Sequence, residues 1–429
     1  MKVAIVGGGY AGMAAAVTLA GQRVPVTVFE AGKSLGGRAR RIEHEESVLD
    51  NGLHILIGAY VETLRLMRLV GADPDRQLLR LPFAWNMHGQ FSLNAAALPA
   101  PFNLLAGLLF ARGLSFTDRL AIARFLLHMR RAAWRLPRDM SVTALLERER
   151  QGAGVRLLWR PLCVSALNTP PETASAQIFL NVLRDTLDAG RAASDLLLPR
   201  ADLSALFPAP AAAWVTARGG SVLTGQRVIA IDAVEGGYAV RHAAGESTYS
   251  HVICAVSPHH TKGLLSGLPE LTEIAQAMDR FAYQPIYSIY LQYPAEVGLP
   301  AAMLGFDSTL LQWAFDRGAL CGQAGLIGLV ISAEGMHEEH AHAALARLVH
   351  QELQRQIGPL PAPCWSQVIA ERRATFACVP NLSRPANRTP LEGFILAGDY
   401  TASDYPATIE AAVRSGIAAA RLVLEQRPG

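Results

Sequence analysis

The chain has 429 residues, of which 51% are hydrophobic and 17% are charged, with a formal net charge of +3. This length exceeds one ordinary hydrophobic core, so we expect two domains, and the composition excludes wholesale disorder. The small net charge does not favour a nucleic-acid-binding protein. The five cysteines are scattered without a C-x-x-C pair, which predicts reduced thiols rather than disulfides or zinc ligands.

The apolar segments are too short to predict a signal peptide or a membrane span. The first apolar run, KVAIV, ends in glycines, and no window offers about 18 uninterrupted apolar residues. We therefore expect a cytoplasmic protein, or one attached to a membrane from its cytoplasmic side.

The N-terminal region combines a buried strand (KVAIV), a glycine-rich turn (GGGYAG) and a helix of small residues, followed by a second strand (VPVTVFEA). Gly7 allows a tight turn, Gly9 lets the backbone approach a pyrophosphate, and Gly12 lets the helix pack on the strand. Glu30 ends the second strand, 18 residues after Gly12, and is placed to accept hydrogen bonds from an adenosine ribose. This spacing predicts a dinucleotide site at a helix N-terminus.

Two more motifs follow the second strand. The first is Gly36-Gly37-Arg38, in which the arginine fork suits a phosphate better than a lysine would. The second, LDNGLHILIGAY, contains Asp50 and His54. We interpret Asp50 as a structural carboxylate that caps a turn. His54 is either a hydrogen-bonded core histidine or a residue of the functional site.

Two long insertions occupy the middle of the chain, at 61–217 and 271–387. The first is mostly helical by pattern. The second mixes apolar strands at 286–293, 310–316 and 325–332 with one helix near 336–357. We expect the two insertions to form a substrate domain together.

The stretch 102–138 starts strongly apolar and then carries seven arginines against a single acid, Asp118. A helix pair with an apolar surface and a basic rim suits peripheral contact with anionic lipid headgroups. The alternative is a substrate-domain helix pair whose arginines are merely solvated. The apolar run is too short to span a bilayer.

The histidine clusters do not predict a metal site. His337 and His340 share a helix face but lack the H-E-x-x-H spacing, so we interpret 337–342 as a solvated helix start. His259 and His260 follow a strand end and a proline, and we interpret them as loop residues.

The chain returns to the first domain twice. Residues 219–258 predict alternating strands that lead to the apolar strand HVICAV, and GFILAGDYT ends a strand at a Gly-Asp turn. The helix after Pro406 has one continuous apolar face, and its N-terminus at 407–409 carries free N–H groups and partial positive charge. No second G-x-G-x-x-G follows, which argues against a built-in NAD(P)H site and leaves the electron donor unidentified.

The glycine turn, the Gly-Gly-Arg motif and the C-terminal Gly-Asp turn together resemble the flavin amine oxidase and phytoene desaturase superfamily. The resemblance implies FAD as the cofactor and an α/β fold with a discontinuous, Rossmann-type FAD-binding domain and an α+β substrate domain. The FAD-binding domain would comprise 1–60, 218–270 and 388–429, and the substrate domain would comprise 61–217 and 271–387.

The same resemblance implies which residues contact the cofactor. Gly37 and Arg38 would approach the pyrophosphate, which Gly398 and Asp399 would meet together with the ribityl chain. The strand around Val228 would supply backbone contacts to the adenine.

At the reactive end of the cofactor, the resemblance places the region from Gly52 to His54 beside the isoalloxazine ring. The backbone of Ile409 would contact the flavin, and Thr408 would face the substrate side of the ring. The helix N-terminus would then stabilise the negative charge of the reduced flavin.

Longer stretches resemble one family within this superfamily, the hydroxysqualene dehydroxylases of bacterial hopanoid pathways. These stretches are LDNGLHILIGAYVETLRLM, LWRPLCVSALNTPPETASAQIF, LQWAFDRG and AGDYTASDYPATIEAAVRSG. The resemblance implies hydride transfer from reduced flavin to hydroxysqualene, a C30 isoprenoid alcohol, whose hydroxyl leaves as water to give squalene. An acid must protonate the leaving oxygen. His54 is a candidate, Thr408 acting through a water is a weaker one, and Asp404 and Tyr405 stay open as candidates.

Two alternatives to this function stay open. A carotenoid-type or phytoene-type desaturase would use the same flavin geometry in the oxidative direction. Some members of the fold bind prenyl groups or proteins without redox chemistry, although such proteins are expected to lose the flavin contacts that this chain keeps. An amine oxidase is less favoured, because Thr408 stands where that family has an aromatic residue.

Overall fold

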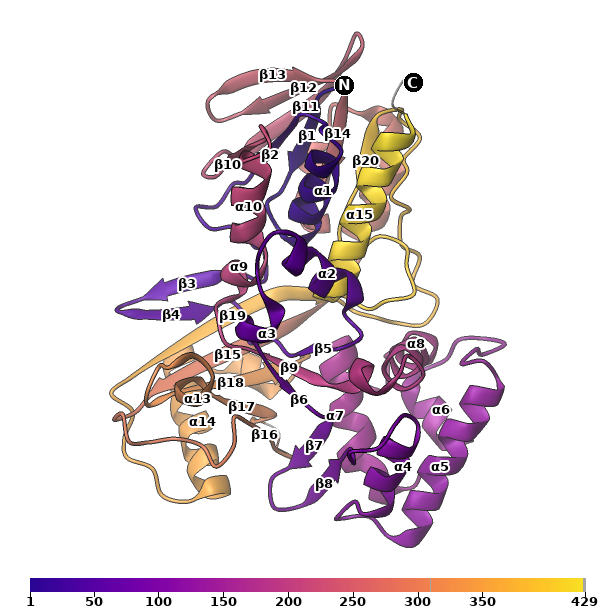
Figure 1. Ribbon diagram of the computed structural model, residues 1–429, viewed down its shortest axis with the longest axis vertical. Coiled ribbons are helices and arrows are strands. Elements are labelled where there is room, and N and C mark those ends of the chain that lie inside the picture. The colour runs from indigo at the N-terminus through magenta and orange to yellow at the C-terminus, as the bar shows by residue number, and fades with distance from the viewer. Residues whose placement is uncertain (309, 427–429) are drawn as a thin grey trace.

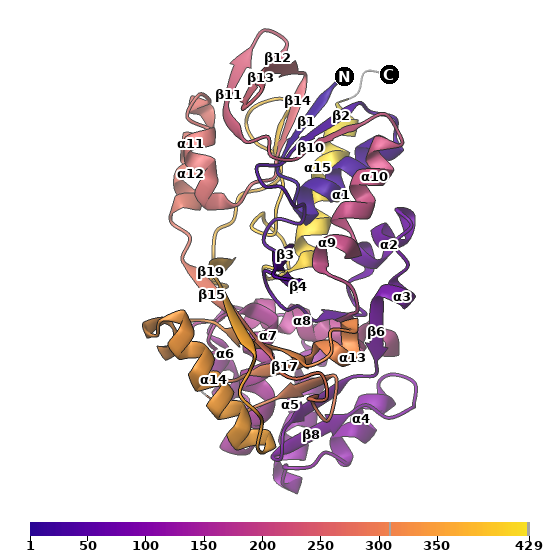
Figure 2. The ribbon, with the colours of Figure 1, turned by 90° about the vertical axis from the view of Figure 1, so that its left-hand side faces the viewer.

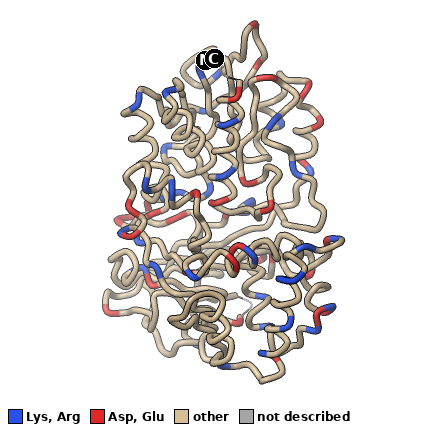
Figure 3. Tube along the Cα trace, turned by 45° about the vertical axis from the view of Figure 1, so that its right-hand side comes forward, with Lys and Arg blue, Asp and Glu red and all other residues tan. Residues whose placement is uncertain are grey.

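The computed structural model describes residues 1–308 and 310–426, which form two halves that lie one above the other in Figure 1. The upper half contains both ends of the chain, and the lower half is built from the middle of the sequence. Charged residues of both signs are interspersed along the whole trace (Figure 3). Among the described residues, no helix combines the length and the apolar character that crossing a membrane requires.

A parallel five-stranded sheet with the order β10-β2-β1-β14-β20 forms the centre of the upper half. Its strands are β1 (Val3–Val6), β2 (Val26–Phe29), β10 (Ser221–Leu223), β14 (His251–Cys254) and β20 (Phe394–Leu396). The three central strands, β2, β1 and β14, are mostly apolar and buried almost throughout, because both faces of a parallel sheet are covered. The predicted Rossmann-type α/β fold is confirmed, and segments from both ends of the chain share one sheet.

Helices cover one face of this sheet and a small antiparallel sheet covers the other (Figure 2). The helices are α1 (Tyr10–Gly21), α10 (Pro208–Thr216) and α15 (Ile409–Glu425), and the small sheet contains β11 (Val228–Val234), β12 (Gly237–His242) and β13 (Gly245–Tyr249). The α1 and α15 helices touch closely, since a Cβ atom on Gly416 would lie 2.1 Å from the Ala11 carbonyl oxygen.

A seven-stranded sheet with the order β19-β15-β18-β17-β16-β7-β8 dominates the lower half. Its strands are β7 (Ala84–Met87), β8 (Phe91–Asn94), β15 (Tyr283–Gln292), β16 (Met303–Gly305), β17 (Trp313–Asp316), β18 (Leu326–Ser332) and β19 (Trp365–Phe376). Successive side chains of a strand point to opposite faces. Ile289 and Leu329 therefore pack on α14 (His342–Ile357), whereas Ile286 and Val330 face the junction with the upper half.

Helices complete the lower half beside this sheet (Figure 1). They are α4 (Phe102–Leu109), α5 (Phe116–Arg131), α6 (Val142–Arg148), α7 (Arg156–Leu167) and α8 (Ala176–Leu187). Edge-to-face contacts among Phe125, Trp159 and Phe179 hold α5, α7 and α8 together. The helix pair expected within 102–138 thus forms α4 and α5, and Ser115 and Asp118 make a capping box at the start of α5.

Shorter elements complete the two halves. They are α2 (Val61–Leu69), α3 (Pro74–Gln77), α9 (Leu203–Leu206), α11 (Thr261–Leu264), α12 (Thr272–Asp279), α13 (Arg317–Cys321), β3 (Arg41–His44), β4 (Ser47–Asp50), β5 (Leu56–Ile57), β6 (Leu78–Leu81) and β9 (Leu196–Pro199). The range 61–217 was predicted to belong wholly to the substrate domain, yet apolar residues of α2, α9 and α10 pack into the same core as α1 and α15.

One local prediction was confirmed with an addition and another was wrong. The insertion 61–217 is mostly helical, as predicted, and it also contains strands β6 to β9, which are too short to show a strand pattern on their own. His337 is buried at 2% exposure rather than solvated, and its ring packs against Tyr287 at 4.8 Å.

Candidate active site

A cavity of about 1070 Å³ lies at the junction of the two halves. This volume slightly exceeds the usual range of ~300–1,000 Å³ for a pocket that binds one small molecule. It is lined by Gly7, Gly9, Glu30, Gly37, Arg38, Gly52, His54, Val228, Gly398, Asp399, Thr408 and Ile409. The structure therefore brings together twelve of the thirteen site residues that the sequence predicted, although their roles stay predictions.

The two glycine motifs form a bare backbone floor at one end of the cavity. The amide of Gly36 donates to the Gly8 carbonyl at 3.0 Å, and Gly9 pairs with Gly36 in a parallel bridge. Gly7 has a φ of +114°, and a Cβ there would lie 2.6 Å from the Ala255 carbonyl oxygen. A floor without side chains lets a diphosphate approach the backbone, so these residues fit a dinucleotide.

Gly12, the thirteenth predicted residue, does not line the cavity. A Cβ at this position would lie 1.9 Å from the carbonyl oxygen of Gly7. Its place is under the turn, where the helix approaches the strand, as the sequence predicted from its packing role.

Glu30 is held beside the glycine floor by two backbone amides. Its carboxylate accepts hydrogen bonds from the amides of Gly8 at 2.8 Å and of Gly32 at 2.7 Å. Each carboxylate oxygen has a second lone pair, so the side chain can still accept hydrogen bonds from a ribose hydroxyl.

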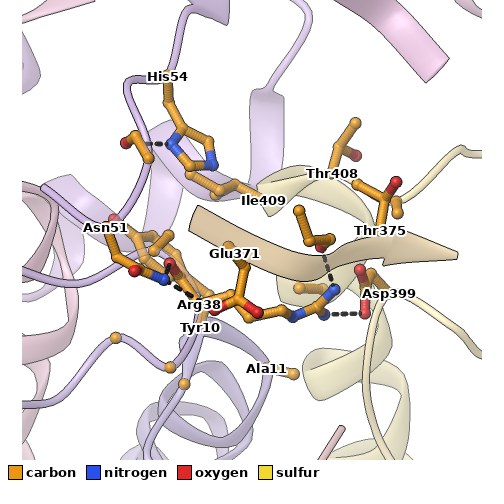
Figure 4. A pocket seen from close by; sticks show the side chains of 18 of the residues that line it. Tyr10, Ala11, Arg38, Asn51, His54, Glu371, Thr375, Asp399, Thr408 and Ile409 are labelled. Atoms are coloured by element: carbon orange, nitrogen blue, oxygen red, sulfur yellow. Dashed lines mark hydrogen bonds and ion pairs between the residues drawn. The ribbon is translucent and has the colours of Figure 1, made fainter. Parts of the chain in front are cut away.

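Arg38 joins three distant parts of the chain (Figure 4). Its guanidinium donates to the Asp399 carboxylate and to the Ala374 carbonyl oxygen, both at 2.6 Å. Burial opposes the charge of Arg38, but the nearby carboxylates of Asp399 and Glu371 outweigh this effect and raise the pKa of Arg38. Asn51 donates to the Arg38 carbonyl at 2.9 Å and to Glu371 at 3.1 Å.

His54 faces the cavity as a neutral imidazole. Burial lowers the pKa of His54, and its Nδ1 lies 2.8 Å from the Gly52 carbonyl oxygen. Because a carbonyl only accepts hydrogen bonds, Nδ1 carries the proton and Nε2 is left as an acceptor. Figure 4 shows the His54 ring beside Ile409, with Thr408 on the far side of Ile409. A neutral ring of this tautomer does not hold a proton for a leaving oxygen.

The N-terminus of α15 points into the cavity. Thr408 precedes the helix and its hydroxyl oxygen accepts a hydrogen bond from the Ala411 amide at 3.1 Å. Glu410, at 1% exposure, accepts from the amides of Glu62 and Thr63 at the start of α2 and also pairs with Arg414 at 2.7 Å. This carboxylate fixes α2 to α15, a role that its one-turn spacing from Arg414 in the sequence does not reveal.

The lower part of the cavity has an aromatic wall that the sequence did not predict. The rings of Trp85 and Trp313 meet edge to face at 4.8 Å, and Phe83 stacks on Trp85 at 6.2 Å. Phe315 lies two residues after Trp313 on β17 and lines the same wall. The alternation of LQWAFD was the available signal, but a short strand does not reveal which face meets a cavity.

Several polar residues of the cavity were missed or misjudged from the sequence. Tyr60, His259 and His260 all line it, and the two histidines belong to a short 3₁₀ helix rather than to a loop. Burial lowers the pKa of His259 to about 4. Of the open acid candidates, Tyr405 lines the cavity, whereas Asp404 is exposed outside it. Residues 1–308 and 310–426 contain no group of three side chains that could hold a metal ion.

Comparisons with known proteins agree with this geometry. Residues 10–424 match the family described as flavin containing amine oxidoreductase. The chain is 30% identical to hydroxysqualene dehydroxylase of Rhodopseudomonas palustris, covering 98% of each chain, and 25% identical to zeta-carotene desaturase of Synechocystis, covering 99% and 97%. Putrescine oxidase bound to putrescine has a similar fold, with a TM-score of 0.73 at 17% identity over 99% of both chains.

These matches extend over nearly the whole chain, and the glycine floor of the cavity fits a dinucleotide. FAD is therefore the cofactor. The chain belongs to the family of flavin-containing amine oxidoreductases, within which it groups with the hydroxysqualene dehydroxylases, and it is an FAD-dependent oxidoreductase.

Proposed function

We propose that this protein removes the hydroxyl of hydroxysqualene to give squalene, as a step of hopanoid biosynthesis. The observation that carries the proposal is one continuous cavity, which runs from the glycine floor past His54 and Ile409 to the aromatic wall of Trp85 and Trp313. Such a wall suits a long hydrocarbon and offers few polar groups. The name of the Rhodopseudomonas relative agrees with this substrate.

In this proposal the FAD diphosphate rests on Gly7, Gly9 and Gly37, and Glu30 accepts hydrogen bonds from the ribose. The backbone near Val228 faces the adenine, and Arg38 with Asp399 and Gly398 holds the centre of the cofactor. Reduced FAD, once bound, supplies the hydride.

The residues of the protein provide the surroundings for that hydride transfer. The N-terminus of α15 at Ile409 carries free N–H groups that stabilise negative charge on a ligand. Apolar side chains exclude water from the carbon that loses its hydroxyl, which protects a developing cation. His54 accepts a hydrogen bond through Nε2, and the proton for the departing oxygen comes from another donor.

A desaturase acting on a carotenoid precursor is the second candidate, because the relatives include zeta-carotene desaturase. Purified, FAD-loaded protein should be incubated anaerobically with hydroxysqualene and a flavin reductant, and separately with phytoene under oxidising conditions. We expect mass spectrometry to detect squalene. Unchanged alcohol together with desaturated phytoene would contradict the proposal. A colourless protein without extractable flavin would favour a non-redox binding role.

We also propose that α4 and α5 contact an anionic membrane on its cytoplasmic face, without spanning it. Both helices expose large apolar side chains: Phe102 is 61% exposed, Phe110 79%, Phe116 72% and Leu120 61%. Arginines are interspersed with them, including the exposed Arg112 and Arg124. Apolar side chains with a basic surround suit the interface of an anionic bilayer, from which an apolar substrate can be drawn.

A further inference from the structure

One face of α8 forms part of the cavity wall and carries a carboxylate. Val182, Asp185 and Thr186 line the cavity at the i, i+3 and i+4 positions of this helix. Val182 is apolar, and the Thr186 hydroxyl donates to the Val182 carbonyl at 2.7 Å, so its proton is used within the helix. Asp185 is the charged group that this face presents to the cavity.

Asp185 is paired with a cation that lies outside the cavity. The Nε of Arg184 donates to the Asp185 carboxylate at 2.7 Å, whereas the lining of the cavity includes Asp185 and not Arg184. The Asp185 side chain keeps 25% of its surface accessible. An ionised carboxylate has about four acceptor positions, of which this bond occupies one. The carboxylate can therefore attract a further positive charge from the cavity side.

Contacts of α8 hold Asp185 beside the start of α15. Asn181, one turn before Asp185, donates through its side-chain NH₂ group to the Asp404 carbonyl at 3.1 Å. From Tyr405 to Ile409, the first residue of α15, the chain then lines the cavity without interruption. Asp185 thus faces the part of the cavity into which the N-terminus of α15 points.

The other carboxylates of the cavity wall belong to the cofactor end. Glu30 accepts from two amides at the glycine floor, and Glu371 and Asp399 lie beside Arg38 (Figure 4). Among the described residues of the lining, Asp185 is the carboxylate that remains for the substrate.

We propose that Asp185 stabilises the positive charge that develops on the substrate carbon as its hydroxyl leaves. This inference rests on the proposed function. In the reaction the carbon–oxygen bond breaks, the oxygen gains a proton from solvent and leaves as water, and the carbon gains a hydride from reduced FAD. The carbon is electron-deficient between these events, and a fixed carboxylate on the wall attracts it. The hydrocarbon product has neither charge nor donor and gains nothing from Asp185.

The test uses a stable ammonium ion in place of the short-lived cation. The probe is an analogue of squalene in which a secondary amine, protonated at neutral pH, replaces the carbon that loses the hydroxyl. The amine and squalene are titrated separately and anaerobically into protein that contains oxidised FAD, and the flavin absorbance spectrum reports binding. We expect Asp185→Asn to bind the amine roughly 10-fold more weakly than the wild type, because a bond to a charged group is lost. Its affinity for squalene should be unchanged.

A second variant separates the action of the carboxylate on a ligand from a structural role. If Asp185 only anchors Arg184, then Arg184→Gln loses the same ion pair and weakens the amine as much as Asp185→Asn does. We expect instead that Arg184→Gln binds the amine at least as tightly as the wild type. Asp185→Glu, which keeps the charge, should retain most of the affinity for the amine.

Asp188→Asn is the matched control. This carboxylate directly follows α8, lies 3.4 Å from the Nε of Arg130 and does not line the cavity. It also accepts from the Trp134 indole at 2.7 Å, and the asparagine oxygen can still accept this bond. Amine binding should equal that of the wild type. FAD content and the unfolding temperature report whether each variant is folded.

The reaction itself provides a second measurement. The single-turnover rate of flavin oxidation by hydroxysqualene should fall roughly 10-fold in Asp185→Asn and stay at the wild-type value in Asp188→Asn.

The inference is overturned if Asp185→Asn binds the amine as tightly as the wild type, or if Arg184→Gln or Asp188→Asn weakens it equally. Two results would contradict the proposed function instead, and this inference would fall with it. In the first, neither the amine nor squalene changes the flavin spectrum of the wild type. In the second, the amine bleaches the flavin, which would mean that the protein oxidises amines.

Discussion

Arg38 shows how one side chain can connect the cofactor site to both halves of the molecule. Its two hydrogen bonds, to Asp399 and to the Ala374 carbonyl, require the fork of a guanidinium. We predict that Arg38→Lys loses one of them, and a hydrogen bond to a charged group is worth ~1.5–3 kcal/mol. The dissociation constant of FAD, measured by quenching of flavin fluorescence on the apoprotein, should rise roughly 10- to 100-fold.

The control for this change is Arg41→Lys. Arg41 pairs at 2.6 Å with Glu43, whose side chain is 74% exposed, so the pair contributes little. An equal loss of FAD affinity in both variants would contradict the specific role of Arg38.

His54 yields a prediction about pH. Burial lowers the pKa of His54 below its ordinary value of 6.5. The ring is therefore mostly neutral at pH 6.5 and becomes charged only at lower pH. We therefore expect that titration of His54 does not lower the single-turnover rate of flavin oxidation by hydroxysqualene as the pH rises from 6.5 to 8. If His54 were the acid, the rate would fall about tenfold for each pH unit above its pKa. Stopped-flow absorbance on the wild type and on His54→Gln decides between these two profiles.

At the scale of single residues, the sequence predicted the site residues whose role depends on the local backbone. Gly7, Gly9 and Arg38 belong to short motifs, and their spacing alone indicates a phosphate site. Tyr60 was missed because its place at the cavity depends on the docking of α2 on α15, where Glu62 binds Glu410, 348 residues later. Nothing in the local sequence distinguishes such a tyrosine from one that packs in a core.

The packing of α15 on α1 decides where the helix N-terminus meets the cavity. A Cβ on Gly416 would lie 2.1 Å from the Ala11 carbonyl oxygen and 3.1 Å from the Ala14 Cβ, so Gly416→Ala must push the helices apart. Overpacking of this kind costs ~1–3 kcal/mol. We expect a lower free energy of unfolding in urea, together with a lower FAD content, because Ile409 moves with the helix.

Gly152→Ala is the matched control for that helix variant. No atom lies within 4 Å of a Cβ at Gly152, and its φ of −74° suits alanine. Its unfolding free energy should stay within ~0.5 kcal/mol of the wild type. A similar loss in both variants would contradict the packing argument.

Helices and strands could be predicted from the sequence where their apolar pattern extends over many residues. The apolar stripe of α15 and the strands β15 and β18 follow their expected periods, and their bounds differ from the predictions by only a few residues. The four-residue strands β6, β7 and β8 were not found. β6 pairs with β9 far along the chain, whereas β7 and β8 pair with each other but are too short to show a strand pattern.

The two halves of the molecule are tied together by a buried ion pair. Arg317 of α13 donates to the Asp50 carboxylate at 3.2 Å, with side-chain exposures of 4% and 2%, and the Leu203 amide donates to the same carboxylate at 2.8 Å. The structural interpretation of Asp50 thus agrees with its surroundings. Removing one partner of a buried pair costs ~3–5 kcal/mol, because the other charge is left uncompensated.

We therefore predict that Asp50→Asn lowers the unfolding free energy by about this amount, as measured by urea denaturation. The double variant Asp50→Asn with Arg317→Met should recover most of the loss, since no buried charge remains. Additive losses in the double variant would show that the two side chains stabilise the protein independently.

Membrane contact is a property of the whole surface, and it can be tested with exposed side chains alone. The triple variant Phe102→Ser, Phe110→Ser and Phe116→Ser removes three rings that are 61%, 79% and 72% exposed. A fully buried Phe contributes ~1.5–3 kcal/mol, so partitioning to vesicles with 30% anionic phospholipid should weaken at least ~30-fold in a flotation assay.

The control triple, Leu69→Ser, Val234→Ser and Met336→Ser, removes exposed apolar side chains elsewhere, at 47%, 42% and 53% exposure. It should float like the wild type, and raising the salt concentration should release the wild type because the arginine contribution is screened. Equal flotation of the two triple variants would place the membrane contact outside α4 and α5. Because the cavity lies behind α7 and α8 rather than beside α4 and α5, turnover of detergent-dispersed hydroxysqualene should survive the loss of membrane binding.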